Sequence, residues 1–266
     1  MRVIPILLVA VLSLGCGNDA RPTPDASSPA KAEADAPRRD DGLGPTGGRV
    51  DLERVGRITG RIRFPGDAPA PGTLDLKQDS WCAENHAVFD ESLVVDPAGG
   101  VAHTLVYLEG LEEWSSDFPL PEGSARLVQD GCRYEPHVLA MRAGQPLDVV
   151  NADDTSHNVH FFSRRNEEYN FTQHRPKTTE IALHRPELDI PVRCAYHPWM
   201  GARVHVFPHP AFAVTGADGR FTIEGVPPGR YRLVVRHERC RGLPGPREIE
   251  VGPGAEVALG DLDLSL

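Results

Sequence analysis

Turn-forming residues are so frequent in this chain that long helices have little room. The 266 residues include 26 Gly and 25 Pro, together about 19%, where ordinary usage gives roughly 12%. Between them lie short runs in which apolar and polar residues alternate. This alternation is typical of β-strands, and many short strands at such spacing are typical of sandwiches or barrels. The sequence therefore predicts an all-β protein built from antiparallel sandwiches.

The clearest alternation covers residues 57–64, where Ile58, Ile62 and Phe64 share one face. Further strands are predicted at residues 93–96, 102–108, 125–129, 147–151, 157–162, 178–183, 189–194 and 203–207. A second set follows Pro210, at residues 211–214, 220–223, 231–236, 247–251 and 256–259. Residues 109–118 are the one stretch predicted to form a short helical turn.

The first sixteen residues have the pattern of an export signal. Arg2 precedes an apolar run over residues 3–14, which is too short to cross a bilayer as a helix but fits a secretory signal. The run ends in Ser-Leu-Gly-Cys at residues 13–16, which resembles the lipobox of bacterial lipoproteins. This resemblance implies lipidation of Cys16. Plain secretion is the alternative, because Ser13 stands where that family usually has Leu.

Residues 17–54 form a polar stretch that is rich in Pro and contains no aromatic residue. Such a composition buries too little apolar surface to offset the entropy of ordering, so we expect a flexible tether. The net charge of −10 argues against nucleic acid as a partner.

The export signal, the lipobox and the tether together predict a protein of the bacterial cell envelope, on its periplasmic or extracellular side. It is expected to touch the membrane only through an N-terminal lipid anchor.

The residues with the clearest chemistry lie between positions 150 and 200. Cys194, His197 and Met200 follow one another at intervals of three, and His157 lies in an upstream strand. Two imidazoles, one thiolate and a weak axial thioether are the ligands of type 1 copper. Strand alternation aims His157 inward, whereas His160 falls on the opposite face and is not expected to bind the same ion.

This ligand pattern resembles the cupredoxins, most closely their amicyanin-like branch, over about residues 137–207. The resemblance implies a Greek-key β-sandwich that holds one type 1 copper. The implied ligands are His157, Cys194, His197 and Met200. It also implies that the Asn158 amide joins the two ligand loops by hydrogen bonds.

In that family the copper carries single electrons, so the resemblance implies a one-electron carrier rather than an enzyme. The partner is expected to be a redox protein, such as a c-type cytochrome or an envelope dehydrogenase or oxidase. It is expected to dock on an apolar patch beside His197 that includes Pro198 and Trp199. The acidic net charge favours a basic partner.

The segment over residues 214–233 is similar to the carboxypeptidase-regulatory-like β-sandwich family, which has no catalysis of its own. Residues 217–219 (Ala-Asp-Gly) are expected to close a hairpin and residues 227–229 (Pro-Pro-Gly) the next turn. The predicted organisation is a signal peptide with lipobox (1–16), a linker (17–54), a cupredoxin-like domain (55–208) and this second β-sandwich (209–266). The strand at 56–64 also looks like the first strand of the second family, which would make that domain split in sequence.

Two other kinds of site fit the same residues less well. A zinc site would need a fourth ligand such as another His, and Met is a poor zinc ligand. A nucleophilic Cys194 would need an exposed, electropositive setting, whereas it ends an apolar alternation. At the level of function, the alternatives are a copper-binding or structural surface protein that binds a partner or glycan without redox turnover, and an electron-accepting module of a larger redox enzyme.

The remaining cysteines are Cys82, Cys132 and Cys240. An oxidising compartment permits disulfides, and Cys82 with Cys132 is the favoured pair because both lie in the same predicted domain. Cys240 is then left free. His205 alternates with its apolar neighbours Val204 and Val206, so it is expected to face solvent.

Overall fold

The computed structural model describes residues 42–243, 245 and 247–266. The predicted signal and Cys16 lie outside the described residues. Within these residues strands predominate, and the helices are one short α-helix and two 3-10 helices, so the predicted all-β class is confirmed. One of the 3-10 helices, Glu112–Asp117, lies where the sequence predicts a helical turn. None of the described helices is long and apolar enough to cross a membrane.

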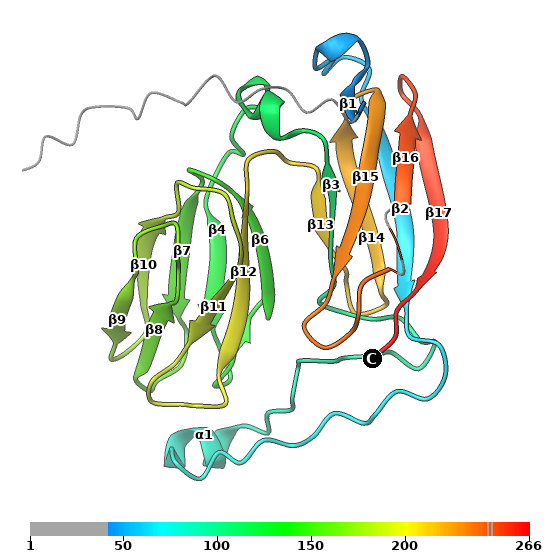
Figure 1. Ribbon diagram of the computed structural model, residues 1–266. Helices are drawn as coiled ribbons and strands as arrows, with labels where there is room; N and C mark the ends of the chain where they lie inside the picture. The colour runs from blue at the N-terminus through cyan, green and yellow to red at the C-terminus, as the bar shows by residue number, and fades with distance from the viewer. Residues whose placement is uncertain (1–41, 244, 246) are drawn as a thin grey trace, which may run out of the picture. The chain divides into compact units, whose positions relative to one another are not determined.

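One β-sandwich, here called the insert sandwich, consists of nine strands in two sheets (Figure 1). One sheet has the order β10-β7-β4-β5 and the other β6-β12-β11-β8-β9. Their bounds are β4 Ala125–Gln129, β5 Tyr134–Glu135, β6 Val138–Arg142, β7 Pro146–Asn151, β8 His157–Phe161, β9 Asn170–Gln173, β10 Lys177–Ala182, β11 Glu187–Arg193 and β12 Gly201–Phe207. The inward residues of alternating strands, such as Val149, Phe161 and Val192, are fully buried in one cluster.

The direction of some strands differs from the predicted antiparallel arrangement. In the insert sandwich β4 pairs with β7 and β6 pairs with β12 in parallel. Each of these pairs joins strands that are separated by others in the sequence, so no short hairpin fixes their relative direction.

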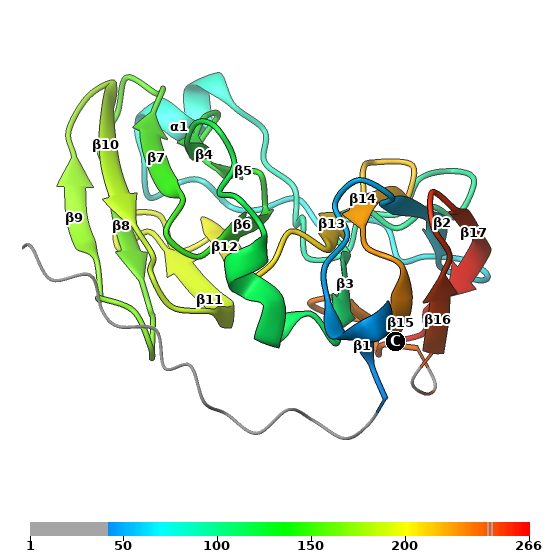
Figure 2. The ribbon, with the colours of Figure 1, turned by 90° about the horizontal axis from the view of Figure 1, so that it is seen from above.

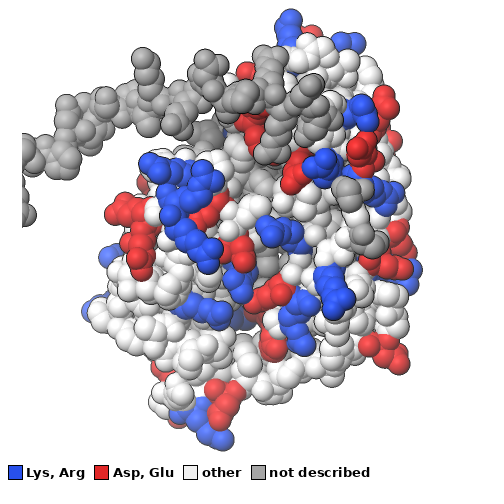
Figure 3. Space-filling view, viewed as in Figure 1, with Lys and Arg blue, Asp and Glu red and all other residues white. Residues whose placement is uncertain are grey.

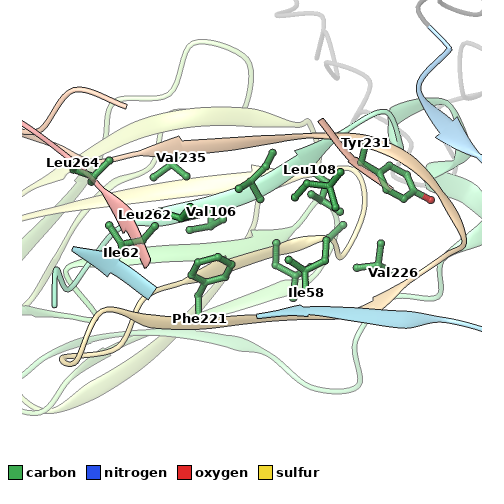
Figure 4. Close-up of a cluster of buried hydrophobic side chains, with 14 of the residues drawn as sticks. Ile58, Ile62, Val106, Leu108, Phe221, Val226, Tyr231, Val235, Leu262 and Leu264 are labelled. Carbon is green, nitrogen blue, oxygen red and sulfur yellow. The ribbon is translucent and has the colours of Figure 1, made fainter. Parts of the chain in front are cut away.

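The second β-sandwich, here called the host sandwich, also has two sheets (Figure 2). One has the order β1-β15-β3-β13 with β16 beside β15, and the other has the order β14-β2-β17. Their bounds are β1 Gly44–Pro45, β2 Gly56–Arg63, β3 Leu105–Glu109, β13 Phe212–Val214, β14 Arg220–Val226, β15 Gly229–Arg236, β16 Arg247–Val251 and β17 Glu256–Asp263. Figure 4 shows its core, in which Ile58 and Ile62 of β2 lie with Phe221 and Leu262.

The host sandwich is split in sequence by the insert sandwich. β2 pairs with β14 and β17, and β3 pairs with β13 and β15. Both β2 and β3 fall inside the predicted 55–208 domain, yet they form sheets with strands that follow residue 209. The apolar face of β2 fits this pairing, because Ile58 and Ile62 are fully buried in a cluster that includes Phe221 and Leu262 of the C-terminal strands.

Two turns of the host sandwich, at residues 215–219 and 227–228, connect strands that lie in different sheets. β13 pairs in one sheet, whereas β14, which follows the turn at Asp218 and Gly219, pairs in the other. The predicted turn at residues 217–219 is present, with the Gly219 N–H donating to the Gly216 carbonyl at 3.0 Å and the Gly216 N–H to the Arg220 carbonyl at 3.1 Å, but the strands on either side do not continue as a hairpin. Gly219 is required at this turn, because its φ is 77° and a Cβ would lie 2.3 Å from the carbonyl oxygen of Ile62.

His205 is buried rather than solvent-facing as predicted, with 6% of its surface exposed. It lies in β12, whose outer face contacts the host sandwich through residues such as Phe207 and Tyr107, with ring centroids 5.2 Å apart. Its Nδ1 accepts a hydrogen bond from the backbone N–H of Asp189. The alternation of β12 identifies two faces correctly, but both of them are covered.

If β2 is a central strand of the host core, Ile62→Ala lowers the free energy of unfolding by about 2–5 kcal/mol, through lost burial and the cavity left behind. Urea denaturation followed by circular dichroism measures this change. Arg57→Ala, on the exposed face of the same strand, serves as the control and changes stability much less. Equal losses in the two variants would contradict the assignment of β2 to this core.

Candidate metal centre

Two neighbouring strands bring the first predicted ligands together. β8 begins at His157, and β11 ends one residue before Cys194. The two strands pair antiparallel, with Arg193 opposite His160. This register places the thiol beside the start of β8, where the backbone N–H of Asn158 lies 3.3 Å from the Cys194 sulfur and donates to it.

The remaining predicted ligands lie in the loop that joins β11 to β12. The register of Arg193 opposite Gly201 makes residues 194–200 a closed loop. The backbone N–H of Met200 donates to the carbonyl of His197 at 2.9 Å, which turns the chain back toward β12. Met200 is 1% exposed and lies in the same buried cluster as Cys194.

The structure brings one nitrogen of each imidazole and the thiol to a common point. The Nδ1 atoms of His157 and His197 are 2.9 Å apart, and the Cys194 sulfur is 3.6 Å from Nδ1 of His197. One ligand atom from each of the three residues lies within 4.8 Å of the others. All three side chains are nearly inaccessible, with 0%, 4% and 1% exposed for His157, Cys194 and His197. Nitrogen and thiolate donors at this spacing can hold one metal ion.

Asn158 joins the two ligand segments, as the resemblance implies. Its side-chain oxygen accepts a hydrogen bond from the backbone N–H of Ala195, and its amide nitrogen donates to the carbonyl of Phe171 at 3.1 Å. The hydroxyl of Tyr134 donates to the backbone carbonyl of Asn158 at 2.8 Å. These contacts fix both segments without using any of the proposed ligand atoms.

A segment over residues 72–90, here called the cap, covers the outer edge of His197. It contains α1 (Ser80–Asn85), which lies below the insert sandwich in Figure 1. Cys82 of α1 forms a disulfide with Cys132, with Cα atoms 5.9 Å apart. The Cys82 sulfur lies 3.9 Å from Nε2 of His197. The pairing is the one favoured by the sequence, and it places the cap directly over the candidate metal centre.

Two carboxylates contact the outer nitrogens of the two imidazoles. Asp79 of the cap lies 3.1 Å from Nε2 of His197, and Asp153 lies 2.9 Å from Nε2 of His157. Burial would raise the pKa of both carboxyls, but backbone N–H groups and the two imidazoles outweigh it, so both pKa values lie below the usual range. Both groups are therefore ionised at neutral pH.

The contact between Cys194 and His197 favours the metal-binding thiolate. Burial would raise the pKa of the Cys194 thiol, but hydrogen bonds from His197 and from backbone N–H groups lower it overall. Burial would lower the pKa of His197, but Cys194 and Asp79 raise it overall. The thiolate is the form that binds metal ions, so the surroundings prepare Cys194 for this role.

The predicted docking patch differs in part from the surface that the structure presents. Pro198 is exposed, but Trp199 is only partly so. The indole N–H of Trp199 donates to the carbonyl of Cys132 at 3.0 Å, and its ring lies against His197. His197 itself is buried because the cap covers its edge. Tyr196, with 46% exposed, is the large side chain that this loop presents to solvent.

Other predicted residues lie apart from this centre. His160 contacts Glu168 rather than the ligand set, as the alternation of β8 predicts. Cys240 is free and buried in the core of the host sandwich. Asp79 and Asp153 were missed by the sequence analysis. The one local signal is that Asp is a favourable N-cap residue. This signal could have predicted the start of α1 after Asp79, but not the contact of Asp79 with His197.

No family model matches the chain, and neither does any curated protein. A search of solved structures finds a Cu-containing nitrite reductase from Thermus scotoductus SA-01 with 17% identity and a TM-score of 0.30, which covers 35% of this chain and 26% of that one. An oxidised amicyanin variant has 18% identity and a TM-score of 0.29, covering 32% and 84%. A purple cupredoxin from Nitrosopumilus maritimus has 19% identity and a TM-score of 0.28, covering 32% and 100%.

Reduction of the Cys82–Cys132 disulfide is expected to destabilise the protein. The bridge joins residues 50 positions apart, and a loop of this size gives about 4 kcal/mol from unfolded-chain entropy alone. Urea denaturation with and without a thiol reductant measures the difference, which should be about 2–4 kcal/mol. The double variant Cys82→Ala with Cys132→Ala should not respond to the reductant, and an equal response in both proteins would contradict this prediction.

Proposed function

We propose that the chain is a type 1 copper protein that carries single electrons between redox partners in the bacterial cell envelope. The observation that carries this proposal is the convergence of Nδ1 of His157, Nδ1 of His197 and the Cys194 sulfur at a buried point. Two imidazoles and one thiolate, with a thioether nearby, are the donors that favour copper in this role. Copper bound there would supply a one-electron couple.

The surroundings of the donor set favour electron transfer over catalysis. Each donor is held before any ion binds: His157 by Asp153, His197 by Asp79 and Cys194 by the backbone N–H of Asn158. Because the donors are buried, a substrate cannot reach them directly. Rigid donors also limit the rearrangement that a change of oxidation state requires. These features support a carrier, with no reaction of its own.

The same geometry disfavours a structural zinc site. A tetrahedral zinc site would take a fourth strong donor, and the groups of metal-binding side chains among the described residues do not include one with a third imidazole. Asp153 and Asp79 contact the outer nitrogens and not the common point of the three donors. Met200 lies in the same buried cluster as Cys194, and a thioether suits copper better than zinc.

The proposed location rests on the sequence and on one structural feature. Export and a lipid anchor at Cys16 are proposed from the first sixteen residues, and the disulfide between Cys82 and Cys132 suits an oxidising compartment. The partner is proposed to be a redox protein such as a c-type cytochrome, which docks near the exposed Pro198. Figure 3 shows that charges of both signs are interspersed on one face of the molecule.

The decisive test is the visible spectrum of the purified chain loaded with Cu(II). We expect an intense absorption from the bond between the Cys194 thiolate and copper, which Cys194→Ala abolishes. The matched control is Cys240→Ala, because Cys240 is the other free cysteine among the described residues and lies in the host sandwich. A colourless wild-type complex, or an absorption that survives in Cys194→Ala, would refute the proposal.

A second candidate is a copper-binding or structural surface protein without redox turnover. The host sandwich favours it, because this sandwich contributes no residue to the candidate ligand set, and the sequence resemblance of residues 214–233 to the carboxypeptidase-regulatory-like family implies a role in stability or adhesion. Cyclic voltammetry separates the two candidates. A reversible one-electron wave supports the carrier, whereas metal binding without such a wave supports the second candidate.

A further inference from the structure

Each imidazole of the candidate copper site has a carboxylate on the nitrogen that faces away from the other donors. Nε2 of His157 contacts Asp153 at 2.9 Å, and Nε2 of His197 contacts Asp79 at 3.1 Å. A carboxylate in this position fixes the tautomer and the orientation of the ring and makes the imidazole a stronger donor. Both rings are therefore held with Nδ1 toward Cys194.

The disulfide connects the two carboxylates. The backbone N–H of Cys82 donates to Oδ1 of Asp79, and the backbone N–H of Cys132 donates to Oδ2 of Asp153, both at 2.9 Å. Each half of the Cys82–Cys132 bridge therefore positions one carboxylate. The disulfide thus joins the cap to the insert sandwich close to the two carboxylates that contact the imidazoles.

We propose that Asp79 is a positioning residue of the copper site, which together with Asp153 strengthens both imidazole donors and stabilises Cu(II) relative to Cu(I). This inference rests on the proposed function, because it assigns a role toward copper. Its physical reason is charge. A carboxylate hydrogen-bonded to a ligand adds negative charge close to the metal, and the more highly charged ion gains more from it.

The structure also gives Asp79 a second role that the test must separate from the first. Its Oδ1 caps α1 by accepting from Cys82, while its Oδ2 faces Thr155 and His197. Asn is as good an N-cap as Asp, so Asp79→Asn keeps the helix cap, while an uncharged amide NH2 replaces the carboxylate oxygen that faces His197 and Thr155. Asp75 offers the matched control, because it is an exposed acid of the same segment that pairs with Lys77.

The experiment titrates the wild-type chain, Asp79→Asn and Asp75→Asn with Cu(II) and, separately under reducing conditions that spare the disulfide, with Cu(I). We expect Asp79→Asn to lower the Cu(II) affinity by about 10–100-fold and the Cu(I) affinity by less. Asp75→Asn is expected to match wild type in both. Asp79→Glu, which keeps the charge, is expected to recover part of the Cu(II) affinity.

Equal losses of Cu(II) and Cu(I) affinity in Asp79→Asn would overturn the inference, because a loosened cap lowers the affinity for both ions alike. Affinities no different from those of Asp75→Asn, including no binding by any of the proteins, would overturn it as well. These readouts need neither colour nor a reversible wave. A wild-type protein that binds Cu(II) without the thiolate absorption therefore refutes the proposed function, while the comparison of affinities still decides the role of Asp79.

Discussion

The pairing of β8 with β11 sets the distance between the first imidazole and the thiol, and the rest of the candidate site is built around it. The two strands bring Asn158 alongside Cys194, so a backbone N–H donates to the sulfur. The loop that follows is closed by the register of β11 with β12, which leaves His197 little freedom. The candidate donors are therefore assembled by the sheet itself, so a metal ion that bound there would not have to organise them.

The candidate ligand set could be predicted from the sequence because each part of it is encoded locally. Strand alternation places His157 and Cys194 on inward faces, and the spacing of three places His197 and Met200 in one short loop. The structure brings the first three together. Asp79 could not be found in this way. It reaches His197 across 118 residues of sequence, and no local pattern records such a contact.

The sequence likewise predicted the local features of the fold but not its long-range pairings. Alternation shows which face of a strand is buried, so Ile58 and Ile62 were correctly expected to share a buried face. It does not show which strand lies alongside, and for this reason the parallel pairs and the sheet-crossing turn at Gly219 were missed. The helix α1 was missed because its six residues are too few to show a helical period.

The insert sandwich leaves the host sandwich after β3 and returns to it at β13, and these two strands are hydrogen-bonded neighbours, with Phe212 opposite Tyr107. The chain thus exits and re-enters through adjacent points of one sheet. A short connector between β3 and β13 would therefore complete the host sandwich in the absence of the insert sandwich. The architecture is modular in the manner of a domain insertion, so the insert sandwich, with the cap that Cys82–Cys132 joins to it, can be gained, lost or exchanged while the host sandwich keeps its own core.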